Sequence, residues 1–495
     1  MHTHYHMTGD SAPIRDLDII LYGAYGCIGH LSAIHLAKQR ELKWAIAGRN
    51  KTRLKALAAT LLGPSSNPEI IVASLDGNIT SWVERAVTIA TAAGPFSVHS
   101  GEKLIEACAA SGTMYADTSD EFYWQRRMIE RHDAAAKLSG ARITLAAGFC
   151  AVAAELGAAT AFEHSPMPPI AVARAGGAAS PARLSAWLER YSGGLSRGVI
   201  RTTHVNASYP KDWATDPYVL APDTPTGLRV DTLVDGMRYP GLVSGEGLVV
   251  PNLFGDYDAR FLRASFVARQ QHVHLRVGSP TSQYSAWVAF LLKHRGSWAS
   301  LTSCPDQKLL LDGSWRYRFV VGGGVQVEIV NGDTNGDDGA SGHSNADAEV
   351  ILSGEGDPGY HFTSVALAEV ALCLAGKSDA GARCIGRAPG VLTPGLAVNT
   401  SALRARLETI GLLRTSVRSL GGRPGVRQQA KESSQAHERK QRTDLMVTPS
   451  PPSSPQGEAQ PQVAMHAAAW AETELVGLEV SARKQSIVDG VLALE

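Results

Sequence analysis

A run of three glycines between a strand-like and a helix-like segment constrains the fold of this chain more than any other feature. Gly23, Gly26 and Gly29 form G-x-x-G-x-x-G directly after the apolar run LDIILY (17–22), and a helical pattern follows to about Lys38. In this context the first glycine permits a tight turn, the second lets backbone approach a pyrophosphate, and the third lets the helix pack on the strand. The helix N-terminus adds N–H groups and partial positive charge. We predict a dinucleotide-binding turn, the alternative being a purely structural one, with these candidate contacts: Gly23, Tyr25, Gly26, Cys27, Ile28 and Gly29.

The segments after this turn alternate between strand-like and helix-like patterns, which is the alternation that builds a parallel sheet. Strands are expected at 17–22, 43–48, 69–76, 86–96, 113–119 and 141–149, and helices at 51–62, 101–112 and 121–138. The predicted fold class is therefore α/β, with an N-terminal Rossmann-type, doubly wound parallel sheet over residues 17–154.

The rest of the chain divides into parts of different composition. Residues 155–412 mix helices, strands and Gly/Pro-containing loops, which favours a second domain of α+β type. Residues 413–495 become basic, Gln-rich and Pro/Ser-rich without a core-forming pattern, so we expect a largely disordered tail. The polar residues 1–16 are expected to be a disordered N-terminus.

The ends of the next strands indicate which cofactor the turn binds. An NAD-preferring site usually has an acidic residue after the second strand, whereas this strand ends in Arg49 and Asn50. An arginine suits the 2′-phosphate of NADP through charge and paired hydrogen bonds, unless it is merely solvent-exposed. Asp76 is placed to meet the adenine edge or to cap a helix. Gly94 and Pro95 would let the nicotinamide side of the cofactor lie against backbone at the end of the fourth strand.

Charge, hydropathy and cysteine spacing exclude several other classes of protein. Lys plus Arg and Asp plus Glu number 47 each, so no net charge draws the chain to nucleic acid. The apolar stretch 364–376 contains Glu369 and is shorter than the roughly 20 residues of a spanning helix, so no transmembrane segment is expected. The six cysteines show no C-x-x-C pair and no zinc-ligand spacing. We therefore expect reduced thiols, no metal site and a cytoplasmic protein.

Motifs along most of the chain carry a family resemblance. In order they are LYGAYGCIG, WAIAGRN, AAGPF, EACAASGTMYAD, RMIERHDAAAKLSGARITLAAGF, YSGG (191–194), TDPYVLAP (215–222), GDPGYHFTSVALAEVALCLAG (356–376) and GVLTPGLAV (390–398). With these motifs, residues 17–412 resemble the saccharopine dehydrogenase-like oxidoreductases, and in particular their trans-acting enoyl reductase branch. The resemblance implies hydride transfer from NADPH to an enoyl chain carried by a polyketide synthase. It also implies that 155–412 form a substrate and dimerisation domain, and hence a homodimer.

Two departures from the family pattern fall where substrate should bind. The family usually follows its Gly-Phe strand end with Asp, whereas Cys150 stands here after Phe149. The family's Asp-x-x-Gly-Glu becomes a segment from Asp117 to Glu121 in which Asp120 replaces the glycine. These changes point to a different substrate or to reduced activity.

Reducing an activated double bond requires a proton donor beside the hydride donor. The candidates near the predicted cleft are Tyr115 and Asp117 at the end of the fifth strand and His99 beyond Gly-Pro-Phe, with Cys150 beyond the sixth strand as a further thiol. Each also has a structural interpretation: a core tyrosine, a turn-forming Asp, a surface His and a packing Cys.

Two other functions stay open. A saccharopine-type amino-acid dehydrogenase or reductase would need a cluster of Arg and Lys for substrate carboxylates, yet segments 92–101 and 146–157 contain neither. A cofactor-binding scaffold without turnover would keep the Rossmann fold for regulation or association with lipid surfaces.

Overall fold

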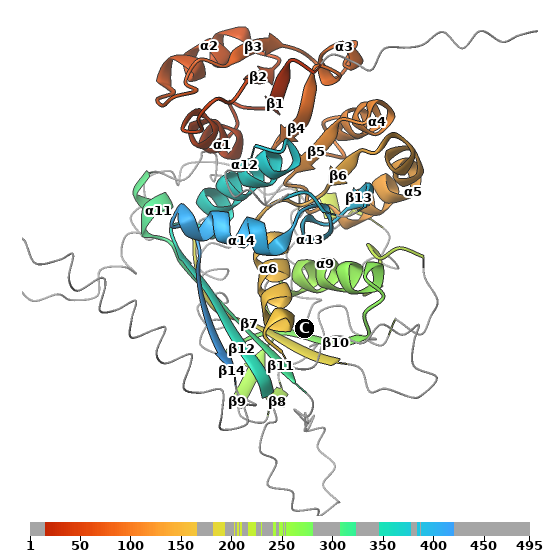
Figure 1. Ribbon diagram of the computed structural model, residues 1–495, viewed down its shortest axis with the longest axis vertical. Coiled ribbons are helices and arrows are strands. Elements are labelled where there is room, and N and C mark those ends of the chain that lie inside the picture. The colour runs from red at the N-terminus through yellow and green to blue at the C-terminus, as the bar shows by residue number, and fades with distance from the viewer. Residues whose placement is uncertain are drawn as a thin grey trace, which may run out of the picture.

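Two seven-stranded sheets, connected by the long helix α6 (Phe149–Glu163), organise the computed structural model (Figure 1). The structure describes residues 15–165, 182–193, 202, 205–206, 208–209, 216–223, 229, 241–243, 247–250, 252, 254–280, 307–322, 346–377, 384–386 and 388–419. The predicted disordered N-terminus up to residue 14 and the tail beyond residue 419 lie outside the described residues. Arg15, by contrast, is placed and donates to the Thr113 hydroxyl at 2.7 Å.

The first sheet has the strand order β13-β6-β5-β4-β1-β2-β3, and all its pairs are parallel. Its strands are β1 (Leu17–Tyr22), β2 (Trp44–Gly48), β3 (Glu69–Val72), β4 (Ala86–Thr91), β5 (Met114–Asp117), β6 (Arg142–Thr144) and β13 (Gly390–Leu392). The helices between them are α1 (Cys27–Ala37), α2 (Lys51–Thr60), α3 (Thr80–Val83), α4 (Gly101–Ser111) and α5 (Phe122–Ser139). The predicted doubly wound parallel sheet is confirmed, although several strands are shorter than predicted because their last residues form the loops at the carboxyl edge.

Alternate side chains of β1 explain why helices cover both faces of this sheet. Ile19 and Leu21 belong to the core formed with α1 and α2, whereas Ile20 and Tyr22 belong to the core formed with α3, α4 and α5. Because neighbouring strand residues point to opposite faces, a strand that is apolar throughout must be buried on both sides. The run LDIILY therefore predicts a central strand, and β1 lies between β4 and β2.

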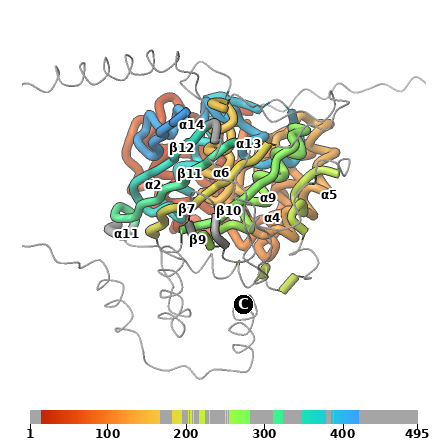
Figure 2. The backbone as a smooth tube through the Cα atoms, turned by 90° about the horizontal axis from the view of Figure 1, so that it is seen from below, coloured from red at the N-terminus to blue at the C-terminus, as the bar shows by residue number. Residues whose placement is uncertain are grey.

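The second sheet is mixed and has the order β14-β12-β11-β7-β10-β9-β8. Its strands are β7 (Ala182–Ser192), β8 (Gly241–Val243), β9 (Gly247–Val250), β10 (Val273–Pro280), β11 (Ser314–Gly322), β12 (Ala346–Glu355) and β14 (Arg414–Ser419). Strands β7 and β10 are parallel and the other pairs are antiparallel. Helix α6 packs on this sheet beside α9 (Gly255–Ala268), as the view from below shows (Figure 2). Short α11 (Gln307–Asp312) precedes β11. The predicted α+β second domain is therefore present.

The chain returns to the first sheet after β12, which sequence patterns did not predict. A π-helical turn η3 (Pro358–Phe362) leads into α12 (Thr363–Leu374), all of whose residues are buried and which packs on α1, β4 and β5. Strand β13, α13 (Pro394–Ala397) and α14 (Thr400–Thr409) follow, and β13 pairs with β6. A division at 154/155 therefore omits segments that complete the Rossmann layer, because strand pairing between distant segments leaves no local sequence signal.

Two further expectations are corrected. Residues 414–419, placed in the predicted tail, form the edge strand β14 paired with β12, even though their side chains are largely exposed. Cys373 and Cys384, expected as thiols, form a disulfide with their Cα atoms 5.0 Å apart. Their spacing matches no motif; the turn after α12 brings them together. Cys108 and Cys150 are free.

Candidate active site

The backbone of the glycine turn fits each predicted role. Gly23 has a φ of +76°, in the left-handed region that favours glycine, and its N–H donates to the Ala47 carbonyl on β2 at 2.9 Å. A Cβ on Gly29 would lie 2.4 Å from the Gly23 carbonyl oxygen, so a larger residue would push α1 away from the turn. Gly26 is exposed, and a Cβ there would meet only the Gly23 oxygen at 3.3 Å. The surface over Gly26 is thus open to a ligand.

The N-terminus of α1 lies at this open surface. Gly26 is its N-cap, no side chain caps the helix, and its first turn contains no acidic residue. The first recorded helix bond is from the His30 N–H to the Gly26 carbonyl at 2.7 Å. The N–H groups before it have no partner within the helix and can donate to a pyrophosphate. Cys27 and Ile28 are half-buried at this end, and their contact with the cofactor stays a prediction.

Two arginines and a tyrosine lie near the end of β2. Arg49 is exposed, whereas the Asn50 side chain caps α2 by accepting from the Arg53 N–H at 3.0 Å. The Tyr25 ring covers Gly48, where a Cβ would lie 2.7 Å from the ring, and the Arg53 guanidinium is 5.7 Å from the ring centroid. Both arginines can meet a 2′-phosphate. Sequence analysis missed Arg53, although its position in the first turn of the helix after β2 is a usable signal.

Asp76 lies on an exposed turn after β3. Its carboxylate is 3.3 Å from the Lys103 ammonium on α4 and accepts from the Ser74 hydroxyl at 3.4 Å. Because these contacts are exposed, they do not fix the side chain strongly. The predicted contact of Asp76 with adenine stays a prediction.

The loop after β4 is tied to the segment after β5 by one buried carboxylate. Gly94 is exposed, and the Gly94–Pro95 peptide bond is cis. Glu121 accepts from the Phe96 N–H at 2.5 Å, from the Ser97 N–H at 3.1 Å and from the Ser97 hydroxyl. The two loops that should flank a nicotinamide are therefore held side by side at the carboxyl edge of the sheet.

The three predicted proton donors occupy different environments. Tyr115 and Asp117 are fully buried, and the Tyr115 hydroxyl donates to the Asp117 carboxylate at 3.0 Å. Asp117 also accepts from the Ser119 N–H at 2.9 Å, the Ser119 hydroxyl at 2.7 Å and the Ala146 N–H at 2.9 Å. Asp117 therefore connects β5 with the end of β6. His99 is exposed in the turn after Pro95. The assignment of these three as proton donors stays a prediction.

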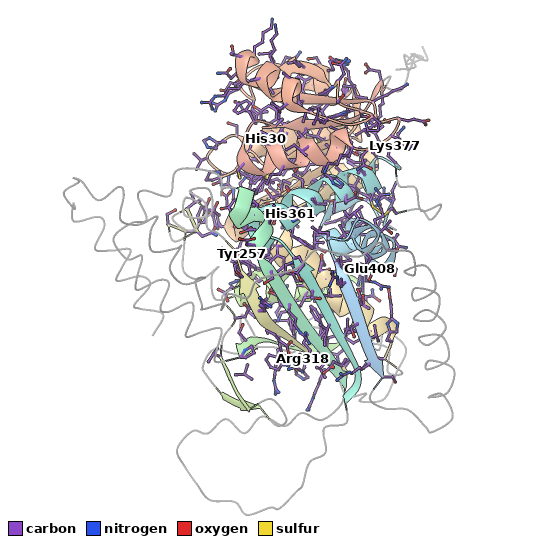
Figure 3. All side chains as sticks on the ribbon, turned by 90° about the vertical axis from the view of Figure 1, so that its left-hand side faces the viewer. His30, Tyr257, Arg318, His361, Lys377 and Glu408 are labelled. Carbon is purple, nitrogen blue, oxygen red and sulfur yellow. A yellow bond between two sulfur atoms is a disulfide. The ribbon has the colours of Figure 1, made fainter. Side chains whose placement is uncertain are left out.

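Residues of the second domain reach the same edge. The Asn206 amide donates to the Asp120 backbone carbonyl at 2.9 Å and lies 3.3 Å from the Tyr257 hydroxyl. The ring of Tyr257, which Figure 3 places below His361 where the two domains meet, lies 4.7 Å from that of Phe122. Sequence analysis gives Asp120 only as a departure from a family pattern and does not single out Tyr257. Their proximity depends on the packing of α9 against α6.

Cys150 lies in the first turn of α6 beside this cluster and is half-buried. Burial, with the charges of Asp258 and Asp120, holds the pKa of its thiol well above the usual range. The thiol is therefore neutral and unreactive at neutral pH, which agrees with a packing role.

None of the helices described is long and apolar enough to cross a membrane. Within the ranges that the structure describes, no group of three or more His, Cys, Asp or Glu side chains could hold a metal ion.

Comparison with known proteins assigns the first domain. Residues 19–144 match the saccharopine dehydrogenase NADP-binding domain. The match covers the first domain, from β1 to β6. This domain is accordingly NADP-binding, and the open surface over Gly26 with Arg49 and Arg53 nearby fits that cofactor.

Curated proteins similar to a larger part of the chain carry a more specific name. A Mycobacterium tuberculosis protein, provisionally named a trans-acting enoyl reductase, is 28% identical over 433 residues, which cover 81% of this chain and 98% of the relative. A Mycobacterium leprae protein named trans-acting enoyl reductase is 40% identical over 146 residues, which cover 29% of this chain and 34% of that protein. The apo saccharopine dehydrogenase (L-Glu forming) of Saccharomyces cerevisiae aligns with 81% of this chain and 100% of its own, at 11% identity and a TM-score of 0.44.

Proposed function

We propose that this oxidoreductase uses NADPH to reduce the carbon–carbon double bond of an enoyl thioester, presented in trans on a carrier such as that of a polyketide synthase. The names of the mycobacterial relatives support the substrate class. The assignment of NADPH as the cofactor rests on the glycine turn, whose surface over Gly26 is open. It also rests on the residues directly after β2, where Arg49 stands instead of an acidic residue and Arg53 lies nearby. Homodimerisation and a cytoplasmic location stay predictions.

The cofactor-binding residues have separable roles. Gly23, Gly26 and Gly29, with the N-terminus of α1, would hold the pyrophosphate. Arg49 would bind the 2′-phosphate, with Arg53 beside it. Gly94 and Pro95 would lie against the nicotinamide. When bound there, NADPH supplies the hydride.

The saccharopine-type alternative has less support at the cleft. Its substrate carries several carboxylates and requires accessible cations. Arg260 and Arg263 are the nearby arginines on α9, but both are 1% exposed and lie against the rings of Phe122 and Tyr218. Arginines enclosed in this way are not presented to a carboxylate substrate.

The first experiment measures NADPH and NADH binding by fluorescence. The wild type should bind NADPH more tightly, and Arg49→Ala should raise the Kd for NADPH about tenfold because a charge-assisted phosphate contact is lost. Gly26→Val should abolish binding of both cofactors by filling the pyrophosphate position. Arg40→Ala removes an exposed arginine beyond the far end of α1 and should change neither Kd.

A second assay follows NADPH oxidation with enoyl thioesters on coenzyme A and on an acyl carrier protein. Turnover, faster on the carrier protein, is the expected result. Tight NADPH binding without any turnover would instead favour the scaffold function, and absence of NADPH binding would contradict the proposal altogether.

A further inference from the structure

We propose that Asp120 donates the proton to the α-carbon in this reduction, an inference that rests on the proposed function. Three carboxylates lie within five residues at the end of β5, namely Asp117, Asp120 and Glu121, and Glu121 contacts the loop where the nicotinamide is expected. Their hydrogen bonds and exposure differ sharply.

Asp117 and Glu121 use their oxygen atoms to hold the fold together. Asp117 accepts four hydrogen bonds and Glu121 accepts three, and each side chain is 0% exposed. Neither carboxylate has access to a substrate, and protonating either would remove acceptors from backbone N–H groups. These two residues are therefore positioning groups.

Asp120 differs from both because the residue is half-buried rather than fully buried. In the described part of the chain, its carboxyl has Thr202 as a side-chain hydrogen-bond partner, while its backbone carbonyl accepts from Asn206. Asn206 in turn lies 3.3 Å from the Tyr257 hydroxyl. Residues of the second domain thus hold the Asp120 backbone, whereas the donors to its carboxyl, in the described part of the chain, are its own backbone N–H and the Thr202 side chain.

The location of Asp120 relative to the cofactor follows from its neighbour. Glu121 bonds the N–H groups of Phe96 and Ser97, directly after Gly94 and Pro95. Because β4 and β5 are adjacent parallel strands, their loops leave the same edge of the sheet. Asp120 therefore directly precedes the residue, Glu121, that contacts the loop at the predicted nicotinamide position.

The electrostatic surroundings favour the protonated acid. Burial first, and then the charges of Glu121 and Asp117, raise the pKa of Asp120 to about 7. Cys150 on α6 and Tyr257 on α9 also interact with Asp120, and burial raises the pKa of both, so they stay neutral. A general acid works best when its pKa lies near the working pH, and Asp120 meets that condition.

The chemical step balances. When bound, NADPH would supply the hydride: a C–H bond of its nicotinamide would break, leaving NADP+, as a C–H bond forms at the β-carbon of the unsaturated thioester. The electron pair of the double bond would move toward the α-carbon and the carbonyl oxygen. The O–H bond of the Asp120 carboxyl breaks, and its proton forms the C–H bond at the α-carbon. The Asp120 carboxylate then recovers a proton from water at its exposed side.

The test compares wild type with Asp120→Asn and Asp120→Gly, the second being the residue of the family pattern. Both variants should keep the NADPH Kd within about twofold, and both should lower kcat by roughly 10²- to 10³-fold, a typical contribution of general acid catalysis. The wild-type kcat should fall as the pH rises through about 7, since the donor is then ionised, and this fall should be absent in both variants. Asp223→Asn, which alters an exposed carboxylate paired with Arg126, is the matched control and should behave as wild type.

A readout independent of activity is the infrared carbonyl band of a protonated carboxyl in the cofactor-free protein. A band that titrates near pH 7 in wild type and Asp223→Asn, and is absent from Asp120→Asn, is expected. If wild type turns over but either Asp120 variant keeps kcat within threefold, the assignment of Asp120 is wrong while the reductase function stands. If wild type binds NADPH but reduces no enoyl thioester, the proposed function fails and the role of Asp120 falls with it.

Discussion

Several buried carboxylates in this protein hold neighbouring elements together by accepting hydrogen bonds. Glu155, in α6, accepts from the Ser265 hydroxyl, from the Thr393 hydroxyl at 2.6 Å and from the Gly395 N–H at 2.6 Å. It therefore connects α6 with α9 and with the segment after β13. Asp117 and Glu121 perform the same task at the cleft. A carboxylate near an active site is thus a catalytic candidate only if its oxygens do not already accept the hydrogen bonds that hold the fold together.

Tyr115 tests this distinction. Tyr115→Phe removes the hydroxyl that donates to Asp117 at 3.0 Å but keeps the ring that is enclosed in the core. The variant should lose about 1 kcal/mol of unfolding free energy and keep kcat within about threefold. Urea unfolding and NADPH oxidation measure the two quantities. A loss of kcat as large as that expected for Asp120→Asn would restore Tyr115 as the proton donor.

At the level of elements, one buried ion network connects three helices. Glu369 on α12 is 0% exposed; His35 on α1 lies 2.7 Å from one of its oxygens, and Arg406 on α14 contacts the other. Burial alone would raise the pKa of Glu369, but the hydrogen bonds from His35 and Arg406 hold it below its usual range. The ionised form therefore stabilises the contact of α12 with its neighbours.

Glu369→Gln should lower the unfolding free energy by about 2–4 kcal/mol at pH 7, because the Arg406 guanidinium and the His35 ring lose their buried carboxylate partner. Since the folded-state pKa is depressed, the stabilisation is complete above the unfolded value of 4.5 and is lost as the pH falls through the folded value. The difference between variant and wild type should therefore shrink below about pH 4.5. Urea midpoints across this range measure it.

Glu408→Gln is the control, since Glu408 on α14 forms a more exposed pair with Arg404 at 3.5 Å (Figure 3). Glu408→Gln should lower the unfolding free energy by less than about 0.5 kcal/mol at any pH. An equal cost for the two variants would contradict the importance of the network.

The elements that could be predicted from the sequence are those whose pattern lies within one short segment of the chain. The run LDIILY, the three glycines and the helix ending at Gly112 each carry their signal within about ten residues, and all are present in the structure. Strand β13 and the cluster of Asp120, Asn206 and Tyr257 depend on contacts between segments far apart in sequence. Short or polar segments such as β13 and β14 have too few apolar residues to show a period.

At the scale of the whole molecule, the two sheets are not built from two consecutive parts of the sequence, because β13 belongs to the first sheet. Helix α12 is buried along its entire length against α1, β4 and β5, and β13 extends the first sheet beside β6. The chain leaves the first sheet through α6, builds most of the second sheet and then returns (Figure 1). The first sheet and its cover are therefore completed by segments from both halves of the sequence, and we expect cofactor binding to depend on the returning segments.

A truncated chain ending at residue 165 tests this dependence. It retains the strands β1 to β6 and the glycine turn but lacks α12, so the face of the sheet that includes Ile19, Leu21 and Ala90 keeps α1 and α2 but loses the rest of its cover. Because exposed apolar surface costs about 25 cal/mol per Å², the fragment should show no cooperative thermal transition, and its NADPH affinity should fall below detection. Co-expression with a second fragment spanning residues 356–419 should partly restore the cooperative thermal transition and the NADPH affinity, since this fragment supplies α12 and β13. A fragment 1–165 that unfolds cooperatively and binds NADPH as tightly as the full chain would show that the returning segments are not needed for the cofactor site.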